Sequence, residues 1–533
     1  MDLMEFAWNY AGWTNDSITA FPALTALAAT WNPDMAARYG KAIGEEARYR
    51  KKDVLLGPGV NIYRTPLNGR NFEYMGEDPY LAGVMAVPYV KELQKNGVAA
   101  CVKHFALNNQ EQWRGTVDVE VSDRALYEIY LPAFKQAIVE GGAWSVMGAY
   151  NKYRGQHCCH NARLLNDILR DEWGFDGCVI TDWGGAHDTK EAALNGLDIE
   201  MGSYTNGLTS DNSLGYNLYY LADPYLEMLK KGELPMASVD AKARNILRLI
   251  FRTSLNQNKP YGSLCTKEHY DVAKVIGDES IVLLRNNGIL PLQADKYNRI
   301  LVVGDNAVRR LTDGGGSSEL KPKDMISPLD ALRALYGDKI EYTQGYACGR
   351  PFFGHEEEMQ QTVIDSLRAE AVAKARQADV VIYVGGLNKN AFQDCESTDR
   401  KSYNLPFSQN ELIEELVAVN PNLVIANISG NAYAMPWLKK APAILHISYL
   451  GTMGGASIAD VISGKVNPSG KLPYSFPVKL SDCSAHSFGE GAYPGIDTGK
   501  EDVSLTDYQR NVGVNPKEEY KDDILVGYRW HDT

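Results

Sequence analysis

The chain has 533 residues, which is more than one hydrophobic core usually supports, so at least two domains are expected. Apolar residues make up 44% and charged residues 23%, an ordinary soluble composition, and no apolar run is long enough to predict a membrane-spanning helix. The net charge of −13, without a dense basic run, argues against nucleic acid as a partner, and eight cysteines are too sparse for a disulfide scaffold.

Short apolar strands alternate with amphipathic helices in the first part of the chain. Buried parallel strands are expected at 54–56, 98–102, 144–147 and 178–180. Helices begin between them at recognisable caps, for example at Ser122-Asp123. The alternation predicts a (β/α) barrel or a doubly wound sheet, and about five strands are fewer than the eight of a complete barrel.

A second alternating block follows a stretch of helices and polar connectors. Its strands are expected at 300–303, 380–384, 423–426 and 444–447, with helices near 361–377 and 408–419. This pattern predicts a three-layer sandwich around a mostly parallel sheet. The end of the chain is rich in Gly, Asp and Tyr, and we expect it to wrap over the other domains as an ordered loop.

The predicted fold class is therefore α/β, an incomplete (β/α) TIM-like barrel followed by a three-layer α/β/α sandwich. The predicted domains are the barrel at 1–205, a helical bridge at 206–275, the sandwich at 276–485 and a C-terminal wrapping segment at 486–533.

Polar side chains follow the predicted strands at their carboxyl ends, where ligands bind in parallel α/β proteins. These positions hold Lys103-His104, Tyr150, Asp182-Trp183 and a loop with Asp394, Glu396, Asp399 and Arg400. A glycosidic bond needs two carboxyl groups, sugar hydroxyls need charged partners, and sugar rings pack on aromatic side chains. The set therefore favours sugar chemistry, although a strand-end aspartate taken alone could equally cap a helix or pair with a lysine.

At these residues the chain resembles glycoside hydrolase family 3, from about residue 18 to the end. The resemblance rests on long motifs in family order: Thr19-Ala20-Phe21-Pro22, Gly57 through Asn61, Gly69-Arg70-Asn71-Phe72-Glu73-Tyr74, Gly76-Glu77-Asp78-Pro79, Lys103-His104-Phe105, Asn109-Gln110-Glu111, Thr181-Asp182-Trp183 and Asn467 through Pro473.

The resemblance implies a role for each matching residue. The nucleophile matches Asp182, and the acid/base matches Glu396 in a Glu-x-x-Asp-Arg segment, with Asp394 as a rival. Many relatives have glycine where this chain has Ser397. Trp183 would form a wall of the pocket, and the residues that would grip the first sugar are Arg70, Lys103, His104, Arg114, Met147 and Tyr150.

The chain departs from the family pattern at both ends. No Asp-Gly-Pro segment precedes Thr19, so we expect one strand and its sugar-binding aspartate to be missing, and the N-terminus to be incomplete. The chain stops at Gly527-Tyr528-Arg529-Trp530, before the β-sandwich that many relatives carry. It contains no signal peptide, and the compartment is left open.

Two segments imitate other kinds of site. Asp313 through Ser318 is glycine-rich but lacks the Gly-Lys-Ser/Thr of a phosphate loop. His157-Cys158-Cys159-His160 resembles a metal cluster, but adjacent cysteines do not easily bind one zinc ion and no second ligand pair stands nearby. We therefore expect no metal site and no cofactor, because two carboxyl groups suffice for glycoside hydrolysis.

The sequence thus predicts a retaining exo-β-glycosidase, favouring a β-glucosidase, that acts by double displacement on terminal non-reducing sugars of an oligosaccharide or aryl glycoside. The tryptophan after the nucleophile resembles the glucosidase side of the family. The alternatives are a β-xylosidase or mixed-specificity β-glycosidase, and an inactive sugar-binding remnant. No nucleic acid or membrane partner is expected, and a homo-dimer is left open.

Overall fold

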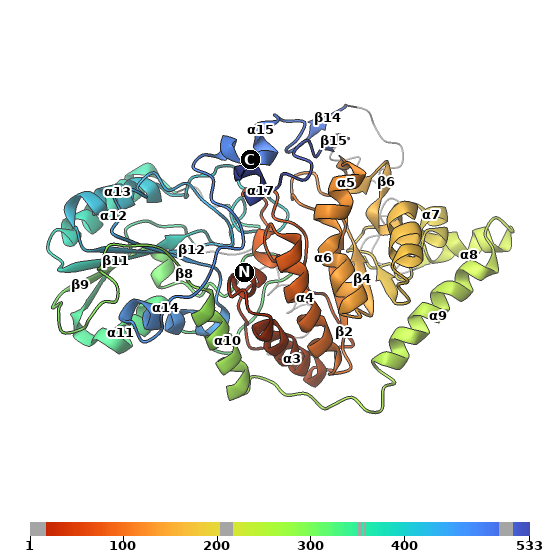
Figure 1. Ribbon diagram of the computed structural model, residues 1–533, viewed down its shortest axis with the longest axis horizontal. Coiled ribbons are helices and arrows are strands. Elements are labelled where there is room, and N and C mark those ends of the chain that lie inside the picture. Colours follow the sequence, from red (N-terminus) through yellow and green to blue (C-terminus); the bar gives the residue numbers. More distant parts are fainter. Residues whose placement is uncertain (1–16, 203–216, 350–353, 357–358, 500–514, 533) are drawn as a thin grey trace. The chain divides into compact units, whose positions relative to one another are not determined.

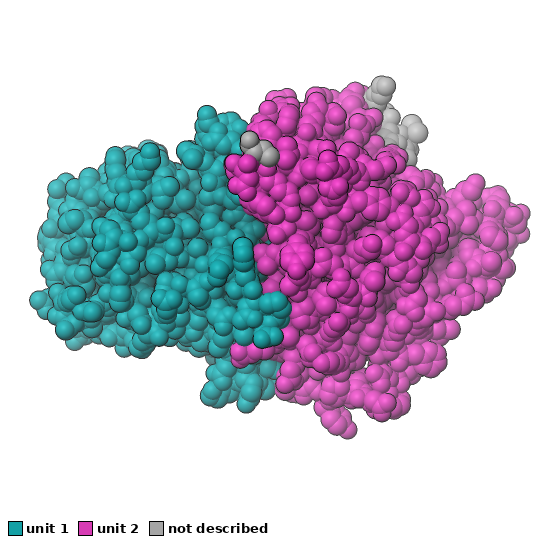
Figure 2. Space-filling view, in the orientation of Figure 1, with its two compact units in different colours: residues 1–35, 66–75, 264–482 teal, residues 36–65, 76–263, 483–533 magenta. Residues whose placement is uncertain are grey.

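The computed structural model describes residues 17–202, 217–349, 354–356, 359–499 and 515–532. The chain forms two compact units, each built from three segments (Figure 2). Unit 1 comprises residues 1–35, 66–75 and 264–482, and unit 2 comprises residues 36–65, 76–263 and 483–533. The short segment 66–75 therefore belongs to unit 1, although its flanking residues belong to unit 2.

Unit 1 is organised around one six-stranded sheet. In the order β10-β9-β11-β12-β13-β8, its strands are β10 (Ile340–Thr343), β9 (Ile300–Val303), β11 (Val380–Gly386), β12 (Leu423–Ile428), β13 (Ala443–Ile447) and β8 (Val282–Asn286). All neighbours pair in parallel except β8, which runs antiparallel to β13. The four predicted strands are the fully buried central ones, whereas the unpredicted strands β8 and β10 are partly exposed strands at the two edges of the sheet.

Helices cover both faces of this sheet, so the predicted three-layer sandwich is confirmed. Alternate residues of β9 point to opposite faces, as the pleat requires. Val302 packs with residues of α11 (Pro328–Tyr336) and α14 (Gly454–Ser463). Leu301 packs with residues of α12 (Gln361–Ala375) and α13 (Gln409–Val419) on the other face (Figure 1). The remaining helices of unit 1 include α2 (Leu24–Ala29), η1 (Asn71–Glu73), η7 (Asp305–Ala307) and α10 (Lys267–Ser280).

Unit 2 contains a four-stranded parallel sheet. Its strands, in spatial order, are β1 (Val54–Leu55), β2 (Ala99–Phe105), β4 (Ser145–Gly148) and β7 (Cys178–Ile180). They agree closely with the four strands predicted for the first half, although both residues of β1 are only partly buried, whereas β4 and β7 and most of β2 are buried. Isolated bridges join Gly59 to Lys103 and Ile180 to Ile199.

Helices follow the strands of unit 2. Pro79 occupies the first turn of α4 and the Asp78 side chain caps it, while the predicted cap Ser122 accepts a hydrogen bond from the Ala125 N–H. The helical segments are α3 (Pro33–Tyr49), α4 (Pro79–Gln94), α5 (Asp123–Ala125), η2 (Leu126–Tyr130), α6 (Pro132–Lys135), η3 (Gln136–Glu140), η4 (Cys158–His160), η5 (Arg163–Glu172), α7 (Thr189–Leu194), α8 (Asp223–Lys230) and α9 (Met236–Arg252). Of the predicted bridge, residues 206–216 lie outside the described residues.

A third sheet joins the end of the chain to the middle of unit 2. Its order is β14 (Ile496–Asp497), β15 (Pro516–Glu519), β3 (Asp118–Glu120), β5 (Lys152–Tyr153) and β6 (Gln156–His157). β15 runs parallel to β3, so a C-terminal strand pairs with one that is distant in sequence. Short helices α15 (Ser484–Ser487) and α17 (Tyr528–His531) complete this part. The α/β fold class is confirmed, and within the described residues no helix is long and apolar enough to cross a membrane.

Candidate active site

The nine residues predicted for the site fall into two groups, one in each unit. Unit 1 holds Arg70 and Glu396. Unit 2 holds the other seven, which are Lys103, His104, Arg114, Met147, Tyr150, Asp182 and Trp183.

Asp182 lies two residues beyond the end of β7, on a strand end that is pinned to residues 199–201. Thr181 donates through its hydroxyl to the Met201 carbonyl, at 3.0 Å, and accepts from the Met201 N–H, at 2.8 Å. The Asp182 carboxylate accepts from the Trp183 N–H at 2.8 Å, and its Oδ2 lies 3.5 Å from Nε2 of His104. Asp182 is 8% exposed, so this carboxylate is almost enclosed yet reachable.

The Lys103-His104 pair is held through its backbone at the end of β2. The Lys103 N–H donates to the Pro58 carbonyl at 3.0 Å, and the Lys103 carbonyl accepts from the Val60 N–H at 2.9 Å. The Asn61 side chain holds the backbone of His104 on both sides. It accepts a hydrogen bond from the His104 N–H at 2.6 Å and donates one to the His104 carbonyl at 2.9 Å. The segment from Gly57 through Asn61 therefore fixes the imidazole that faces Asp182.

Arg114 and Tyr150 form a second contact within unit 2. The guanidinium carbon of Arg114 lies 4.7 Å from the centroid of the Tyr150 ring, and Nη1 donates to Glu111 at 2.7 Å. A cation over an aromatic face is held by the ring quadrupole, and the carboxylate fixes the other end of the guanidinium. The structure thus brings together these two residues, which the resemblance assigned to the same sugar subsite.

Met147 and Trp183 differ sharply in exposure. Met147 is 2% exposed and packs with Cys101 and Ile180 in a small core cluster, which is also the ordinary role of a strand methionine. Trp183 is 43% exposed, as a wall that a sugar ring could pack against would be. The sugar-binding roles of both residues stay predictions.

Glu396 is held in a loop of unit 1 by backbone contacts. Its own N–H donates to the Gly315 carbonyl at 2.8 Å, and its Oε2 accepts from the Ser317 N–H at 2.5 Å. Gly316 makes this possible, because a Cβ there would lie 2.4 Å from the Cβ of Glu396 and its φ is +133°. The glycine-rich segment from Asp313 through Ser318, which resembles a phosphate loop in sequence, therefore holds the predicted acid/base in place.

Arg70 lies beside Glu396 but is bound more tightly to another carboxylate. Its Nε and Nη2 each donate to Glu73 at 2.9 Å, a bidentate pair, whereas Nη1 is 3.6 Å from Oε1 of Glu396. A separation of 3.6 Å is too long for a hydrogen bond, so Arg70 does not lock Glu396 as it locks Glu73. The Arg70 backbone follows Gly69, where a Cβ would lie 2.1 Å from the carbonyl oxygens of Cys395 and Thr398.

Ser397 occupies a backbone conformation that favours glycine. Its φ is +73°, in the left-handed region where a side chain costs about 1–2 kcal/mol. This explains physically why glycine suits the position after the glutamate, where this chain places a serine in the left-handed conformation.

Asp394, the rival acid, is a structural carboxylate. It is completely buried, and it accepts from the Tyr449 hydroxyl at 2.7 Å, the Gly430 N–H at 2.8 Å and the Asn431 amide at 2.7 Å. Burial raises the pKa of Asp394, and these donors oppose that effect. Its oxygens accept three hydrogen bonds inside unit 1, so Asp394 takes part in holding the loop, and the choice between Glu396 and Asp394 as the acid stays a prediction.

The His157-Cys158-Cys159-His160 segment is packed as core. Both thiols are buried, and burial raises the pKa of Cys158 to about 12. Nδ1 of His160 lies 2.8 Å from Glu191, and its Nε2 accepts from the His187 N–H at 3.1 Å. Within the residues that the structure describes, no group of three or more His, Cys, Asp or Glu is placed to hold a metal ion.

Sequence reasoning missed several residues that support the site. Asn61 and Glu73 lie in the motifs that carried the family resemblance, but no role was assigned to them. The Arg70–Glu73 pair had a readable signal, because opposite charges three residues apart in a helical turn face each other. The hydrogen bond from Ser317 to Glu396 had no signal in the sequence, because the two residues are distant along the chain.

Two family models match the chain. The glycosyl hydrolase family 3 N-terminal domain matches residues 10–249, and the glycosyl hydrolase family 3 C-terminal domain matches residues 281–528. Together they span most of the chain, in the order in which the two alternating blocks occur.

Named relatives agree with these matches. Beta-glucosidase BoGH3A of Bacteroides ovatus is 62% identical, over 99% of this chain and 69% of its own length. An exo-alpha-(1->6)-L-arabinopyranosidase of Bifidobacterium breve is 37% identical, over 97% of this chain and 63% of its own. The structure of beta-glucosidase 3B from Thermotoga neapolitana in complex with glucose superposes with a TM-score of 0.81 at 33% identity, covering 97% of this chain and 70% of that one.

A glycoside hydrolase is thus the class that the fold and the carboxylates define. The chain belongs to glycosyl hydrolase family 3, as the sequence motifs predicted.

Proposed function

We propose that the chain acts as a retaining β-glucosidase, with Asp182 as the nucleophile and Glu396 as the acid/base. The observation that carries this proposal is the contrast among the acidic side chains. Asp182 is nearly buried at a strand end beside His104, and Glu396 is nearly buried at the Ser317 N–H, whereas Glu73 is held bidentately by Arg70 and the completely buried Asp394 accepts three hydrogen bonds.

In the first half of the proposed reaction, an Asp182 oxygen attacks the anomeric carbon of the terminal sugar. The bond to the leaving oxygen breaks, and Glu396 transfers its proton to that oxygen. The product is a glycosyl ester of Asp182. His104 and Trp183, which adjoin Asp182, are proposed to bind a hydroxyl group and the apolar face of the ring.

In the second half, the ionised Glu396 takes a proton from water, whose oxygen attacks the anomeric carbon and displaces Asp182. Two inversions restore the original β configuration. The mechanism requires the two carboxyl groups to come within roughly 5–5.5 Å of each other, because the wider spacing of inverting enzymes leaves room for a water molecule between carboxylate and sugar.

The sugar preference is the finer part of the proposal. Glucose is favoured because relatives at 62% and 33% identity are named beta-glucosidases, and one of them is described in complex with glucose. An arabinopyranosidase at 37% identity makes a pentopyranoside the second candidate, which a β-xylosidase or mixed-specificity enzyme would also accept.

A substrate panel tests the proposal. The chain is assayed with p-nitrophenyl β-D-glucoside, β-D-xyloside and α-L-arabinopyranoside, and the first-formed sugar is examined by NMR. We expect the highest kcat/KM with the glucoside and release of the β anomer. Preference for a pentoside would overturn the sugar assignment, and first release of the α anomer would overturn retention. Glucose binding without turnover of any member would identify the chain as a sugar-binding remnant.

A further inference from the structure

The segment between β2 and β3 is strained and carries a predicted sugar ligand. It begins after Lys103-His104 and includes Arg114, which contacts Tyr150. Leu107 has a φ of +71° and Trp113 a φ of +56°, both in the left-handed region that bulky side chains disfavour. Such conformations persist only when surrounding contacts over-determine them. Contacts from outside the segment must therefore hold it in this conformation.

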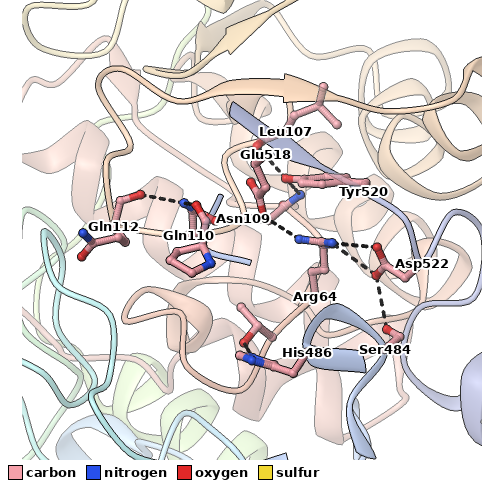
Figure 3. Close-up of polar contacts among 12 residues, drawn as sticks. Arg64, Leu107, Asn109, Gln110, Gln112, Ser484, His486, Glu518, Tyr520 and Asp522 are labelled. Atoms are coloured by element: carbon pink, nitrogen blue, oxygen red, sulfur yellow. Dashed lines mark hydrogen bonds and ion pairs between the residues drawn. The ribbon is translucent and has the colours of Figure 1, made fainter. Parts of the chain in front are cut away.

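The C-terminal part of the chain supplies contacts at the strained position. The Tyr520 hydroxyl donates to the Leu107 carbonyl at 3.1 Å and accepts from the Asn109 amide at 3.0 Å (Figure 3). The Gln110 amide donates to the carbonyl of Pro494, at 2.9 Å, as well as to Gln112 in its own segment. All these residues belong to unit 2.

Tyr520 is itself fixed from several directions. Its ring lies 3.9 Å from the guanidinium carbon of Arg64 and 5.0 Å, centroid to centroid, from the Tyr130 ring. Its N–H donates to the Glu120 carbonyl at 2.8 Å, where β15 and β3 pair. Arg64 is in turn bound by Glu518, at 2.6 Å, and by Asp522, at 2.7 Å (Figure 3). These contacts fix the ring and backbone of Tyr520, so its hydroxyl has a defined position, which a positioning group requires.

We propose that the Tyr520 hydroxyl is a positioning group for substrate binding. By fixing Leu107 and Asn109 it holds the segment that carries Arg114, and Arg114 meets the sugar. Tyr520 makes no contact with substrate in this account. The inference rests on the proposed function, because it concerns how well the same sugar is bound.

The test is Tyr520→Phe, which removes one hydroxyl and keeps the ring against Arg64 and Tyr130. The matched control is Tyr336→Phe in unit 1, where a buried tyrosine hydroxyl likewise donates to a backbone carbonyl, that of Leu292, at 3.0 Å. Tyr520→Phe loses two hydrogen bonds and Tyr336→Phe loses one, so both should show a small fall in Tm, the larger one in Tyr520→Phe. Only Tyr520→Phe should raise KM for the aryl β-glucoside, by about five- to tenfold, the scale of one or two lost hydrogen bonds, with kcat changed less than KM.

A second measurement does not depend on activity. Hydrogen exchange of peptides covering 107–117 should become faster in Tyr520→Phe and stay unchanged in Tyr336→Phe. If exchange there is unaltered, or if KM rises equally in the two variants, Tyr520 has no positioning role. If the wild-type chain hydrolyses no glycoside, the proposed function fails, and hydrogen exchange alone then decides whether Tyr520 holds the segment.

Discussion

The two predicted catalytic carboxylates are held in place by different means. Asp182 follows strand β7 and faces His104 on strand β2, and both strands pair in parallel with β4, which lies between them, so the sheet sets the position of Asp182. Glu396 lies in a loop without helix or strand, and contacts at Gly316 and Gly69 together with the buried Asp394 shape that loop. A regular scaffold tolerates many sequences, whereas a loop built on close backbone approaches depends on a few particular residues.

The largest effect is expected from Asp182→Asn. An amide cannot form the glycosyl ester, so kcat should fall by several orders of magnitude while the fold persists, because the strand end is held by Thr181 rather than by this carboxylate. Steady-state kinetics and circular dichroism measure the two quantities. Asp188→Asn is the control, because Asp188 caps α7 in the same loop and asparagine caps equally well. A comparable loss of kcat in both variants would contradict the assignment of Asp182 as the nucleophile.

Glu396→Ala should produce a smaller loss that depends on the substrate. Leaving groups that need protonation should suffer severely, whereas acidic phenols should lose much less in the first step. Azide should restore the second step by attacking the glycosyl ester without base assistance and give a β-glycosyl azide. Glu411→Ala, which removes an exposed glutamate of unit 1, serves as the control. Equal slowing of good and poor leaving groups, with no azide effect, would contradict the acid/base assignment.

Asp394→Ala separates support of the loop from chemistry. Three buried donors, from Tyr449, Gly430 and Asn431, would lose their acceptor, at a cost of about 1–3 kcal/mol each. Urea unfolding should therefore show a loss of several kcal/mol, and azide should not restore activity. Unchanged stability combined with azide rescue would instead make Asp394 the acid.

The smallest effect is expected at Ser397. Glycine would relieve the left-handed strain at φ +73°, so Ser397→Gly should raise the free energy of unfolding by up to about 1 kcal/mol and leave kcat unchanged. Ser397→Val should lower both stability and activity, because a β-branched residue is poorly suited to that conformation. A less stable glycine variant would mean that the serine hydroxyl is more valuable than the relief of strain.

The buried central strands of the sheets could be predicted from the sequence, because they are apolar runs. The loop contacts that surround the candidate site could mostly not be predicted. Strand β7 and the position of Asp182 after it follow from three apolar residues and a polar strand end. The pairing of β15 with β3 was not predictable, because it joins short polar strands almost 400 residues apart in sequence. The contact of Ser317 with Glu396 and the buried role of Asp394 likewise depend on loop approaches that no local period encodes.

Trapping of the glycosyl-enzyme tests the central claim most directly. A 2-deoxy-2-fluoro-β-glucoside with an activated leaving group destabilises both transition states, so the ester formed in the first step accumulates. We expect one fluoroglucosyl group per chain, located by peptide mass spectrometry on Asp182, and its slow loss should accompany the return of activity. An adduct on another residue, or turnover of the aryl glucoside without any adduct, would contradict the account.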